Sequence, residues 1–164
     1  MGKVPIYRRD EGTIDLSFPG NAKDHWERMQ KFVTEAANGL PTPTELLDIG
    51  CGGGALIEFL ISIGIRAIGI DKNSQLSSPS RDIRLGDIHA LPFEDRSFNV
   101  AYSFGIFDSR QYMLDQETVF GEVKRVLRPE GLYLIQDFDQ PNLALARGFE
   151  ICKSSEYISI LKRI

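Results

Sequence analysis

The sequence lacks the long apolar run that a membrane-spanning helix needs. Such a helix requires about 20 consecutive apolar residues, and no stretch of this 164-residue chain approaches that length. The first residues, MGKVPIYRRDEG, also contain no apolar core of a secretory signal. We therefore expect a soluble protein of the cytoplasm that has no contact with a membrane.

Cysteine is scarce as well, and the 19 basic residues are outnumbered by 23 acidic ones. The two cysteines, Cys51 and Cys152, have a spacing that fits neither a zinc site nor a disulfide framework. We interpret both as small buried thiols in a reducing compartment. The net charge of -4 and the pI of about 5.2 disfavour a general nucleic-acid binder, which usually carries a dominant basic field.

The length of 164 residues fits one domain with a single core. We predict three parts of a single domain: a flexible arm over residues 1–21, an amphipathic helix within residues 22–40, and a core over residues 45–164. Prolines, glycines and charges are mixed in the first part, whereas apolar residues recur at helical spacing in the second.

Short apolar segments alternate with helical or loop pieces along the core. This alternation predicts an α/β fold with a doubly wound, mostly parallel sheet that is covered on both faces. Near the end of the chain, two further segments predict an antiparallel terminal hairpin. The expected strands are Leu46–Ile49, Ala67–Ile70, Ile83–Leu85, Phe98–Ser103, Leu132–Ile135, Phe149–Lys153 and Tyr157–Leu161. A helix is expected over Gln116–Leu127.

The segment LLDIGCGGG, residues 46–54, is the most informative part of the sequence. An apolar strand leads into a loop of glycines, and the apolar spacing after it predicts a helix that ends at Gly64. Glycines at 50, 52 and 54 permit positive φ angles and a close approach of a ligand to the backbone. Strand, glycine loop and helix in this order indicate a nucleotide-type site.

Two carboxylates follow the next two expected strands. Asp71 can accept both hydroxyls of a ribose, with a helix cap or turn as the alternative. Asp87 can accept from the exocyclic amine of adenine while the Ile88 N–H is offered to a ring nitrogen, with the cap of a short turn as the alternative. His89 follows directly, and its place beside an adenine contact disfavours a catalytic role.

The glycine spacing alone leaves two cofactors open, because Gly50-x-Gly52-x-x-Ala55 also satisfies the fingerprint of nicotinamide dinucleotides. Four strings in order, LLDIGCGGG, GID, GDIHALPFEDRSFNVAYS and RVLRPEGLYLI, favour the other one. Together they resemble class I S-adenosylmethionine-dependent methyltransferases, specifically the small-molecule branch called type 11. The resemblance covers residues 45–154 and implies S-adenosyl-L-methionine as the cofactor.

The resemblance also implies roles for individual residues. The glycine loop would line the methionine part of the cofactor, Asp48 would fix the loop and reach the amino group, and the remaining residues would contact ribose, adenine and sulfonium. The implied cofactor residues are Asp48, Gly50, Cys51, Gly52, Gly54, Asp71, Lys72, Asp87, Ile88, Ser103 and Phe104. Lys72 would flank the ribose, and Ser103 and Phe104 would lie beside the methionine amino group and the sulfonium.

The implied fold is a seven-stranded Rossmann-like sheet with one antiparallel strand near its edge. The sequence departs from the family in having only a short piece at residues 73–82, where relatives usually carry a helix, and little chain for a lid at residues 136–147. We therefore expect a minimal substrate lid, so that the arm, residues 105–115, or a second chain would cover the substrate. Arg128-Pro129-Glu130-Gly131 also lacks the usual double glycine of that turn.

The expected reaction is a direct in-line displacement at the methyl carbon, which does not require a dedicated base, so no catalytic residue is assigned. The acceptor is expected to be a small or modest-sized molecule contacted by Tyr7, Phe107, Asp108 and Tyr112.

No metal ion is expected, since Asp137 and Asp139 fit a solvated turn better than a metal site. Two alternatives remain: a cofactor-binding, non-catalytic partner or regulatory module, and an NAD-dependent oxidoreductase. A homodimer or a protein partner would close the site.

Overall fold

The computed structural model describes residues 4–6, 14–16, 22–40, 44–76, 82–107, 115–137, 139–155 and 157–164. Contacts divide the chain into two compact units, Met1–Gly39 and Leu40–Ile164, and each is described by itself. None of the described helices is long and apolar enough to span a membrane.

The first unit contains a small hairpin and one helix. Strands β1 (Val4–Ile6) and β2 (Ile14–Leu16) pair antiparallel, whereas the sequence predicts no regular element there. Three-residue strands, one with a proline at its centre, are too short to show an apolar period. The predicted helix is present as α1, Ala22–Asn38.

The second unit is built on a seven-stranded sheet in the order β5-β4-β3-β6-β7-β9-β8. The first five of these strands are parallel, β9 runs antiparallel to β7, and β8 runs antiparallel to β9. The strands are β3 (Glu45–Ile49), β4 (Arg66–Asp71), β5 (Ile83–Leu85), β6 (Phe98–Phe104), β7 (Leu127–Gln136), β8 (Phe149–Ser154) and β9 (Ile158–Arg163). The predicted mostly parallel sheet with its C-terminal antiparallel hairpin is confirmed.

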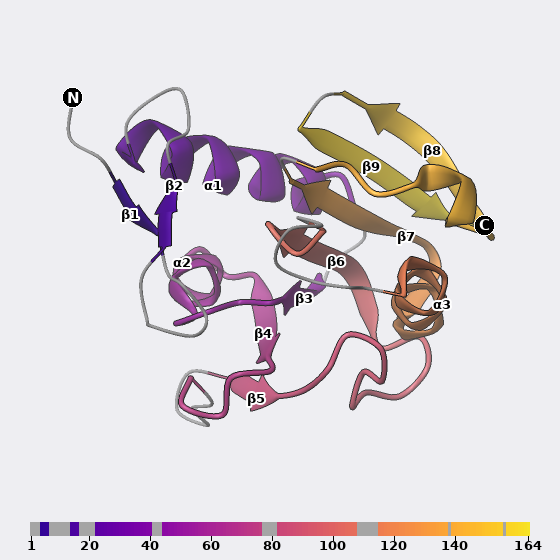
Figure 1. The fold of residues 1–164 in the computed structure, drawn as a ribbon, viewed down its shortest axis with the longest axis horizontal. Helices are drawn as coiled ribbons and strands as arrows, with labels where there is room; N and C mark the ends of the chain where they lie inside the picture. The colour runs from indigo at the N-terminus through magenta and orange to yellow at the C-terminus, as the bar shows by residue number, and fades with distance from the viewer. Residues whose placement is uncertain are drawn as a thin grey trace. The chain divides into compact units, whose positions relative to one another are not determined.

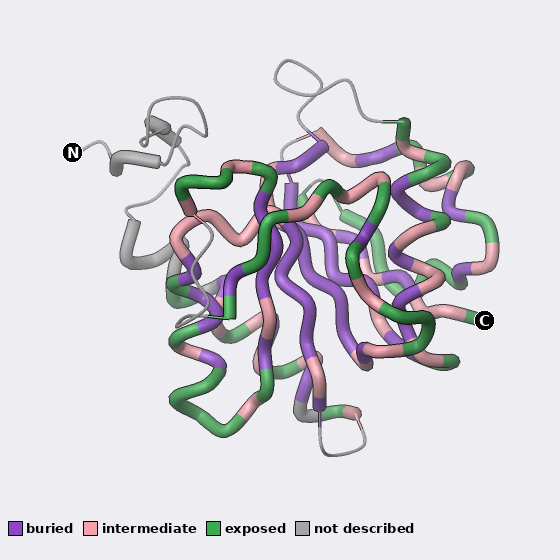
Figure 2. Tube along the Cα trace, turned by 90° about the horizontal axis from the view of Figure 1, so that it is seen from below, coloured by how far each residue is buried: buried purple, intermediate pink, exposed green. Residues whose placement is uncertain are grey.

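Helices cover this sheet on both faces. Gly69 of β4 lies beneath Ile57 of α2 (Ala55–Ser62), because a Cβ built at Gly69 would meet the Ile57 side chain at 2.3 Å. On the other face, the Phe120 ring of α3 (Gln116–Val126) lies 6.3 Å from the ring of Tyr133. The strands between them are buried over most of their length (Figure 2). Both helices therefore bury apolar stripes on opposite faces of one sheet (Figure 1).

The strand order places a crevice beside β3. The chain leaves β3 for α2 on one face, and it leaves its neighbour β6 for α3 on the other face. At such a reversal the two connections diverge and leave room at the carboxyl ends of the two strands. The glycine loop follows β3 at this point, and Gly105 follows β6.

The sequence predicts short connections at residues 73–82 and 136–147, and the described parts of both, apart from the last residue of β7, contain only turns. Residues 73–76 form a turn, and the described residues between β7 and β8 contain a single 3-10 turn, Leu143–Leu145. Strand β7 begins earlier than predicted, at Leu127, and continues through Pro129 and Glu130. Glu130 has a φ of 65°, a left-handed conformation that favours glycine.

Candidate functional site

Most of the buried polar side chains described in the structure lie at the carboxyl edge of the parallel strands. They come from the last residues of β3, β4, β6 and β7 and from the residue that follows β7. They are Asp48, Asp71, Ser103, Gln136 and Asp137, each less than 9% exposed. Burial of polar groups is costly unless hydrogen bonds compensate for it. The clustering of these side chains at one edge of the sheet therefore indicates a functional site there.

The glycine loop is fastened to the end of β4 by its own backbone. The N–H groups of Gly50 and Cys51 donate to the carbonyl of Ile70 at 2.8 and 3.0 Å. The N–H of Gly52 donates to Oδ2 of Asp71 at 3.1 Å. Positive φ angles at Gly50, Gly52 and Gly54 make this path possible without strain. The loop thus turns these donors inward, toward the protein.

The outer surface of the loop is open. A Cβ built at Gly52 or Gly53 would meet no atom within 4 Å, whereas one at Gly54 would meet Ile83 at 2.6 Å. The side of Gly54 on which a Cβ would lie is therefore filled by packing, whereas at Gly52 and Gly53 no described atom fills that side. The Cys51 side chain lies over Gly69, so its backbone is the part that faces the crevice. Neither cysteine is buried as the sequence analysis predicted, because Cys51 is half-buried and Cys152 is exposed.

Asp71 joins the loop to the segment that follows it. Its side chain is buried, and Oδ1 accepts the N–H of Asn73 at 2.9 Å while Oδ2 accepts that of Gly52. Each carboxylate oxygen has a second lone pair and can accept a further hydrogen bond. Lys72 is exposed directly beside it. The turn that was the alternative for Asp71 is therefore present, and it leaves capacity for ribose hydroxyls.

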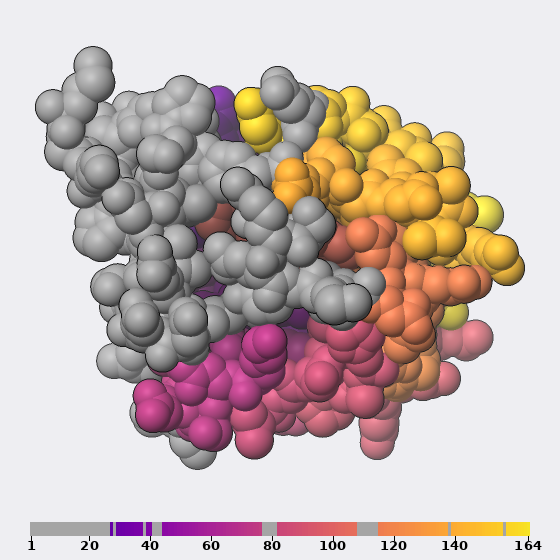
Figure 3. All heavy atoms as spheres, viewed as in Figure 1, coloured from indigo at the N-terminus to yellow at the C-terminus, as the bar shows by residue number. Residues whose placement is uncertain are grey.

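The turn after β5 lies next to this carboxylate. Gly86 donates its N–H to the carbonyl of Asp71 at 3.0 Å, and Figure 3 shows the atoms that follow β4 beside those that follow β5. Asp87 is exposed, and its Oδ1 accepts from the backbone N–H and from Nδ1 of His89 at 2.8 and 2.7 Å. These bonds lower the pKa of Asp87, with the backbone bond as the largest cause. Ile88, the next residue of the turn, is half-buried.

The charges and donors at this edge suit a cationic ligand better than a pyrophosphate. A dinucleotide needs backbone N–H groups at the glycine loop, but those of Gly50, Cys51, Gly52 and Gly54 already donate to protein acceptors. Three buried carboxylates, Asp48, Asp71 and Asp137, end the neighbouring strands. The site therefore carries negative charge, which attracts cationic groups such as an ammonium or a sulfonium.

A comparison with protein families shows which family has this sequence pattern. Residues 47–135 match the model described as "Methyltransferase domain". The chain belongs to this family. A protein of Mycolicibacterium smegmatis named "probable S-adenosylmethionine-dependent methyltransferase" is 28% identical over 130 residues, which are 75% of this chain and 49% of that protein. These findings confirm the predicted methyltransferase family, and the name of this relative gives S-adenosylmethionine as the methyl donor of that protein.

Two further relatives support the assignment. A demethylmenaquinone methyltransferase of Renibacterium salmoninarum is 28% identical over 121 residues, 70% of this chain and 49% of that protein. The crystal structure of the PH0226 protein from Pyrococcus horikoshii matches the fold with a TM-score of 0.68 and 18% identity over 88% of this chain and 93% of that chain. The methyltransferase domain described here spans about half the length of the curated relatives it matches.

Two predicted site residues of the methyltransferase domain face its core instead. The Ser103 hydroxyl is fully buried and lies 3.0 Å from the hydroxyl of Tyr133. The Phe107 ring is 3% exposed and stacks on Phe120 with a centroid distance of 6.0 Å. The Phe107 ring therefore packs under α3, and the contact of Phe107 with the acceptor stays a prediction. Phe104, between them, is half-buried at the strand end.

The sequence analysis missed the burial of Asp137. It assigned this residue to a solvated turn, but the side chain is 2% exposed. Its Oδ2 accepts the N–H of Phe107 at 2.7 Å and its Oδ1 that of Asp139 at 3.3 Å. Asp137 thus fastens the segment that leaves β6 to the end of β7. Its place directly after an apolar strand was the available signal.

The remaining expectations are placed as follows. Tyr7, Asp108 and Tyr112, predicted to contact the acceptor, lie outside the described residues. Among the residues that the structure describes, no group of three or more His, Cys, Asp or Glu side chains is arranged to hold a metal ion.

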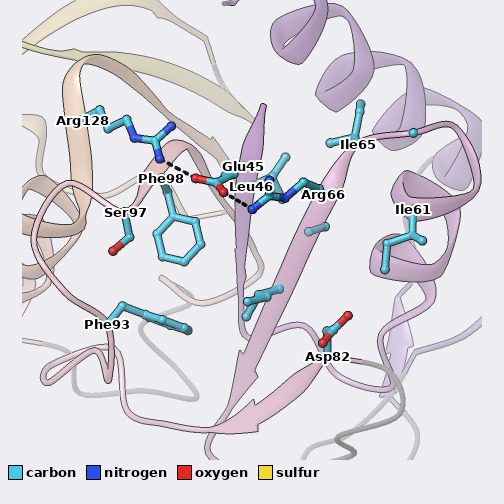
Figure 4. A pocket seen from close by; sticks show the side chains of 13 residues that line it. Glu45, Leu46, Ile61, Ile65, Arg66, Asp82, Phe93, Ser97, Phe98 and Arg128 are labelled. Atoms are coloured by element: carbon cyan, nitrogen blue, oxygen red, sulfur yellow. Dashed lines mark hydrogen bonds and ion pairs between the residues drawn. The ribbon is translucent and has the colours of Figure 1, made fainter. Parts of the chain in front are cut away.

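A pocket of about 690 Å³ lies at the opposite end of the strands, away from the glycine loop. Its lining includes the first residues of β3 and β4, and Glu45 pairs there with Arg66 and Arg128 (Figure 4). Ligands of doubly wound sheets bind at the carboxyl ends of the strands. This pocket therefore lies at the end of the sheet opposite to the one where such folds bind their ligands.

Proposed function

We propose that this chain transfers the methyl group of S-adenosylmethionine to a small or modest-sized organic acceptor. The family supports methyl transfer, and the demethylmenaquinone methyltransferase among its relatives is named for a small-molecule acceptor. The proposal places the cofactor on the unit formed by Leu40–Ile164. The observation that carries it is the buried carboxylate of Asp71, which is bonded to the glycine loop and adjoins the Asp87 turn.

In this proposal, different residues contact the ribose, the adenine and the methionine part of the cofactor. Asp71 accepts from the ribose hydroxyls with its remaining lone pairs, while Lys72 flanks the ribose. Oδ2 of Asp87 accepts from the adenine amine, and the Ile88 N–H donates to a ring nitrogen. The loop residues Gly50, Cys51, Gly52 and Gly54 line the methionine part through their backbone. Asp48 fixes this loop and balances the ammonium charge, and the backbone of Ser103 and the side chain of Phe104 border the sulfonium.

When bound, the cofactor supplies an electrophilic methyl group for in-line displacement. The contribution of the protein is to hold the acceptor atom about 3 Å from that carbon and to exclude water. Asp137 supports this by fixing the segment after β6 through the Phe107 N–H. No described side chain is assigned as a base. The arm, with Tyr7, and the segment with Asp108 and Tyr112 stay predicted acceptor contacts.

Calorimetric titration with S-adenosylhomocysteine and with NADH tests the cofactor. We expect micromolar binding of the first and none of the second, and the reverse result would overturn the proposal. Transfer of a labelled methyl group to a panel of phenols, quinols, amines and carboxylates then tests the activity. Transfer to a panel member supports the enzyme, whereas binding without transfer to any of them favours the alternative of a non-catalytic module.

Closure of the site by a second copy or a partner protein is a separate prediction. Little chain is available between β7 and β8 for a lid, since the described residues there form only a short turn. Light scattering with and without S-adenosylhomocysteine measures the mass in solution. A dimer that forms or tightens with the ligand supports closure by a second copy.

A further inference from the structure

Both ring nitrogens of His89 are engaged. Nδ1 lies 2.7 Å from Oδ1 of Asp87, and Nε2 lies 3.2 Å from the backbone N of Asp115. A backbone N–H only donates, so Nε2 is the acceptor in that bond. The proton of the neutral ring is therefore on Nδ1, where it is donated to Asp87. An imidazole used in this way at both nitrogens is not available as a base.

The first of these bonds fixes the orientation of Asp87. Its Oδ1 accepts twice from His89, from the backbone N–H and from Nδ1. No described group donates to its Oδ2. The Asp87 side chain is 64% exposed, so little packing restricts its rotation, and the imidazole bond adds to the backbone bond in fixing its orientation. His89 thus holds one oxygen of the carboxylate and leaves the other able to accept from a ligand.

The second bond reaches the start of α3. Asp115 is the N-cap of this helix, with Oδ1 accepting the Thr118 N–H at 3.2 Å and Oδ2 accepting the Thr118 hydroxyl at 2.8 Å. The N–H that His89 accepts belongs to this capping residue. The imidazole therefore joins the turn after β5 to the helix that covers the other side of the crevice.

We propose that His89 is a positioning residue that determines the base specificity of the cofactor site, by holding Asp87 so that its Oδ2 accepts the exocyclic amine of adenine. This inference rests on the proposed function, because it assumes that the adenine lies against Asp87. A hypoxanthine base carries an oxygen in place of that amine. A fixed carboxylate repels this oxygen, whereas a mobile one turns away from it.

The experiment compares binding of S-adenosylhomocysteine and S-inosylhomocysteine to the intact chain by calorimetry. We expect the wild type to prefer the adenine compound by at least tenfold. His89→Ala keeps the backbone bond to Oδ1 and removes only the imidazole bond, so we expect it to lose part of that ratio, by about threefold or more. A purely structural role would weaken both compounds equally and leave the ratio unchanged. Urea denaturation of each variant reports any loss of folding separately.

Two further variants test the two hydrogen bonds of the imidazole separately. His89→Asn keeps a donor near the Nδ1 position, and His89→Gln keeps an acceptor near the Nε2 position. We expect His89→Asn to retain the base preference and His89→Gln to lower it. Conversely, we expect His89→Gln to retain the exchange protection of the Asp115 amide, which His89→Asn loses.

The outcomes separate the inference from the function on which it rests. A wild type that binds neither compound overturns the proposed function and this inference together. A wild type that prefers adenine while His89→Ala prefers it equally overturns only the role of His89. A lowered ratio in His89→Ala with its recovery in His89→Asn establishes it.

Discussion

Asp71 supports both the glycine loop and the proposed cofactor site. Its buried carboxylate accepts two backbone N–H groups, and each buried donor without its acceptor costs about 1–3 kcal/mol. We expect Asp71→Ala to lower the free energy of unfolding by about 2 kcal/mol and to raise the Kd of S-adenosylhomocysteine by about a hundredfold. Urea denaturation and calorimetry measure the two effects.

Asp82→Asn is the matched control for this change. Asp82 is exposed at the start of the neighbouring strand, and its φ of 52° is one that asparagine tolerates. We expect neither stability nor binding to change in this variant. Equal binding by Asp71→Ala and the wild type would remove the ribose assignment.

Glycines of this unit differ in what surrounds them, and alanine substitutions separate their roles. A Cβ at Gly53 meets nothing within 4 Å, whereas one at Gly69 meets Ile57 and Cys51 at 2.3 and 2.5 Å. Gly69→Ala is expected to destabilise the fold by about 1–3 kcal/mol through overpacking. We expect Gly53→Ala to stay within about 0.5 kcal/mol of wild type and yet to bind S-adenosylhomocysteine less tightly. Unchanged binding by Gly53→Ala would contradict a cofactor over this loop.

At the level of elements, β7 contains a local conformation that its sequence does not favour. Glu130 has a φ of 65°, and its carboxylate pairs with Lys162 of β9 at 2.5 Å. A left-handed conformation costs a residue with a side chain roughly 1–2 kcal/mol, whereas an exposed ion pair contributes less than about 1 kcal/mol. We expect Glu130→Gly to raise the free energy of unfolding by about 0.5–1 kcal/mol, measured in urea. Lys162→Met, which removes only the pair, serves as the control and is expected to change stability little.

The elements show which parts of the fold the sequence predicts. Apolar periods are local, so the strands and helices of the core were predicted within a few residues, and the terminal hairpin with them. Two features were missed because they depend on tertiary contacts or are too short. The face of β6 on which Ser103 lies follows from sheet register, and β1 is only three residues long. Motif order predicts a site at the carboxyl edge of the sheet, but it did not predict the burial of Asp137 or the stacking of Phe107.

For the whole molecule, binding of the cofactor is linked to stability. A ligand that binds only the folded state stabilises it by about 2.7 kcal/mol at a hundred times its Kd. In a domain of this size, 1 kcal/mol corresponds to a shift in Tm of about 2–4 °C. We expect saturating S-adenosylhomocysteine to raise Tm by about 5–10 °C and NADH to leave it unchanged, as thermal denaturation followed by circular dichroism would report. A shift with NADH alone would favour the dinucleotide alternative.

The stability of the whole molecule should also depend on acid pH through carboxylates that hold its loops. Glu122 of α3 accepts from Arg125 at 2.8 Å and from the Leu91 N–H at 2.7 Å, and the Arg125 side chain in turn donates to the carbonyls of Leu91 and Phe93. The bond to Arg125 is the main cause that lowers the pKa of Glu122 below its ordinary value of 4.5. A carboxyl group whose pKa is lower in the folded state binds protons more readily when unfolded.

The stability that Glu122 contributes is therefore fully present above about pH 4.5 and is lost as the pH falls through the folded pKa. Glu122→Gln is expected to lower the free energy of unfolding by about 1–2 kcal/mol at pH 7. The difference from the wild type should shrink toward pH 3, because the protonated wild type resembles the variant. Urea denaturation between pH 3 and pH 7 measures this convergence, with Glu94→Gln, an exposed carboxylate, as the control. A difference that stays constant across this range would show that the ionised form of Glu122 does not hold the segment after β5 to α3.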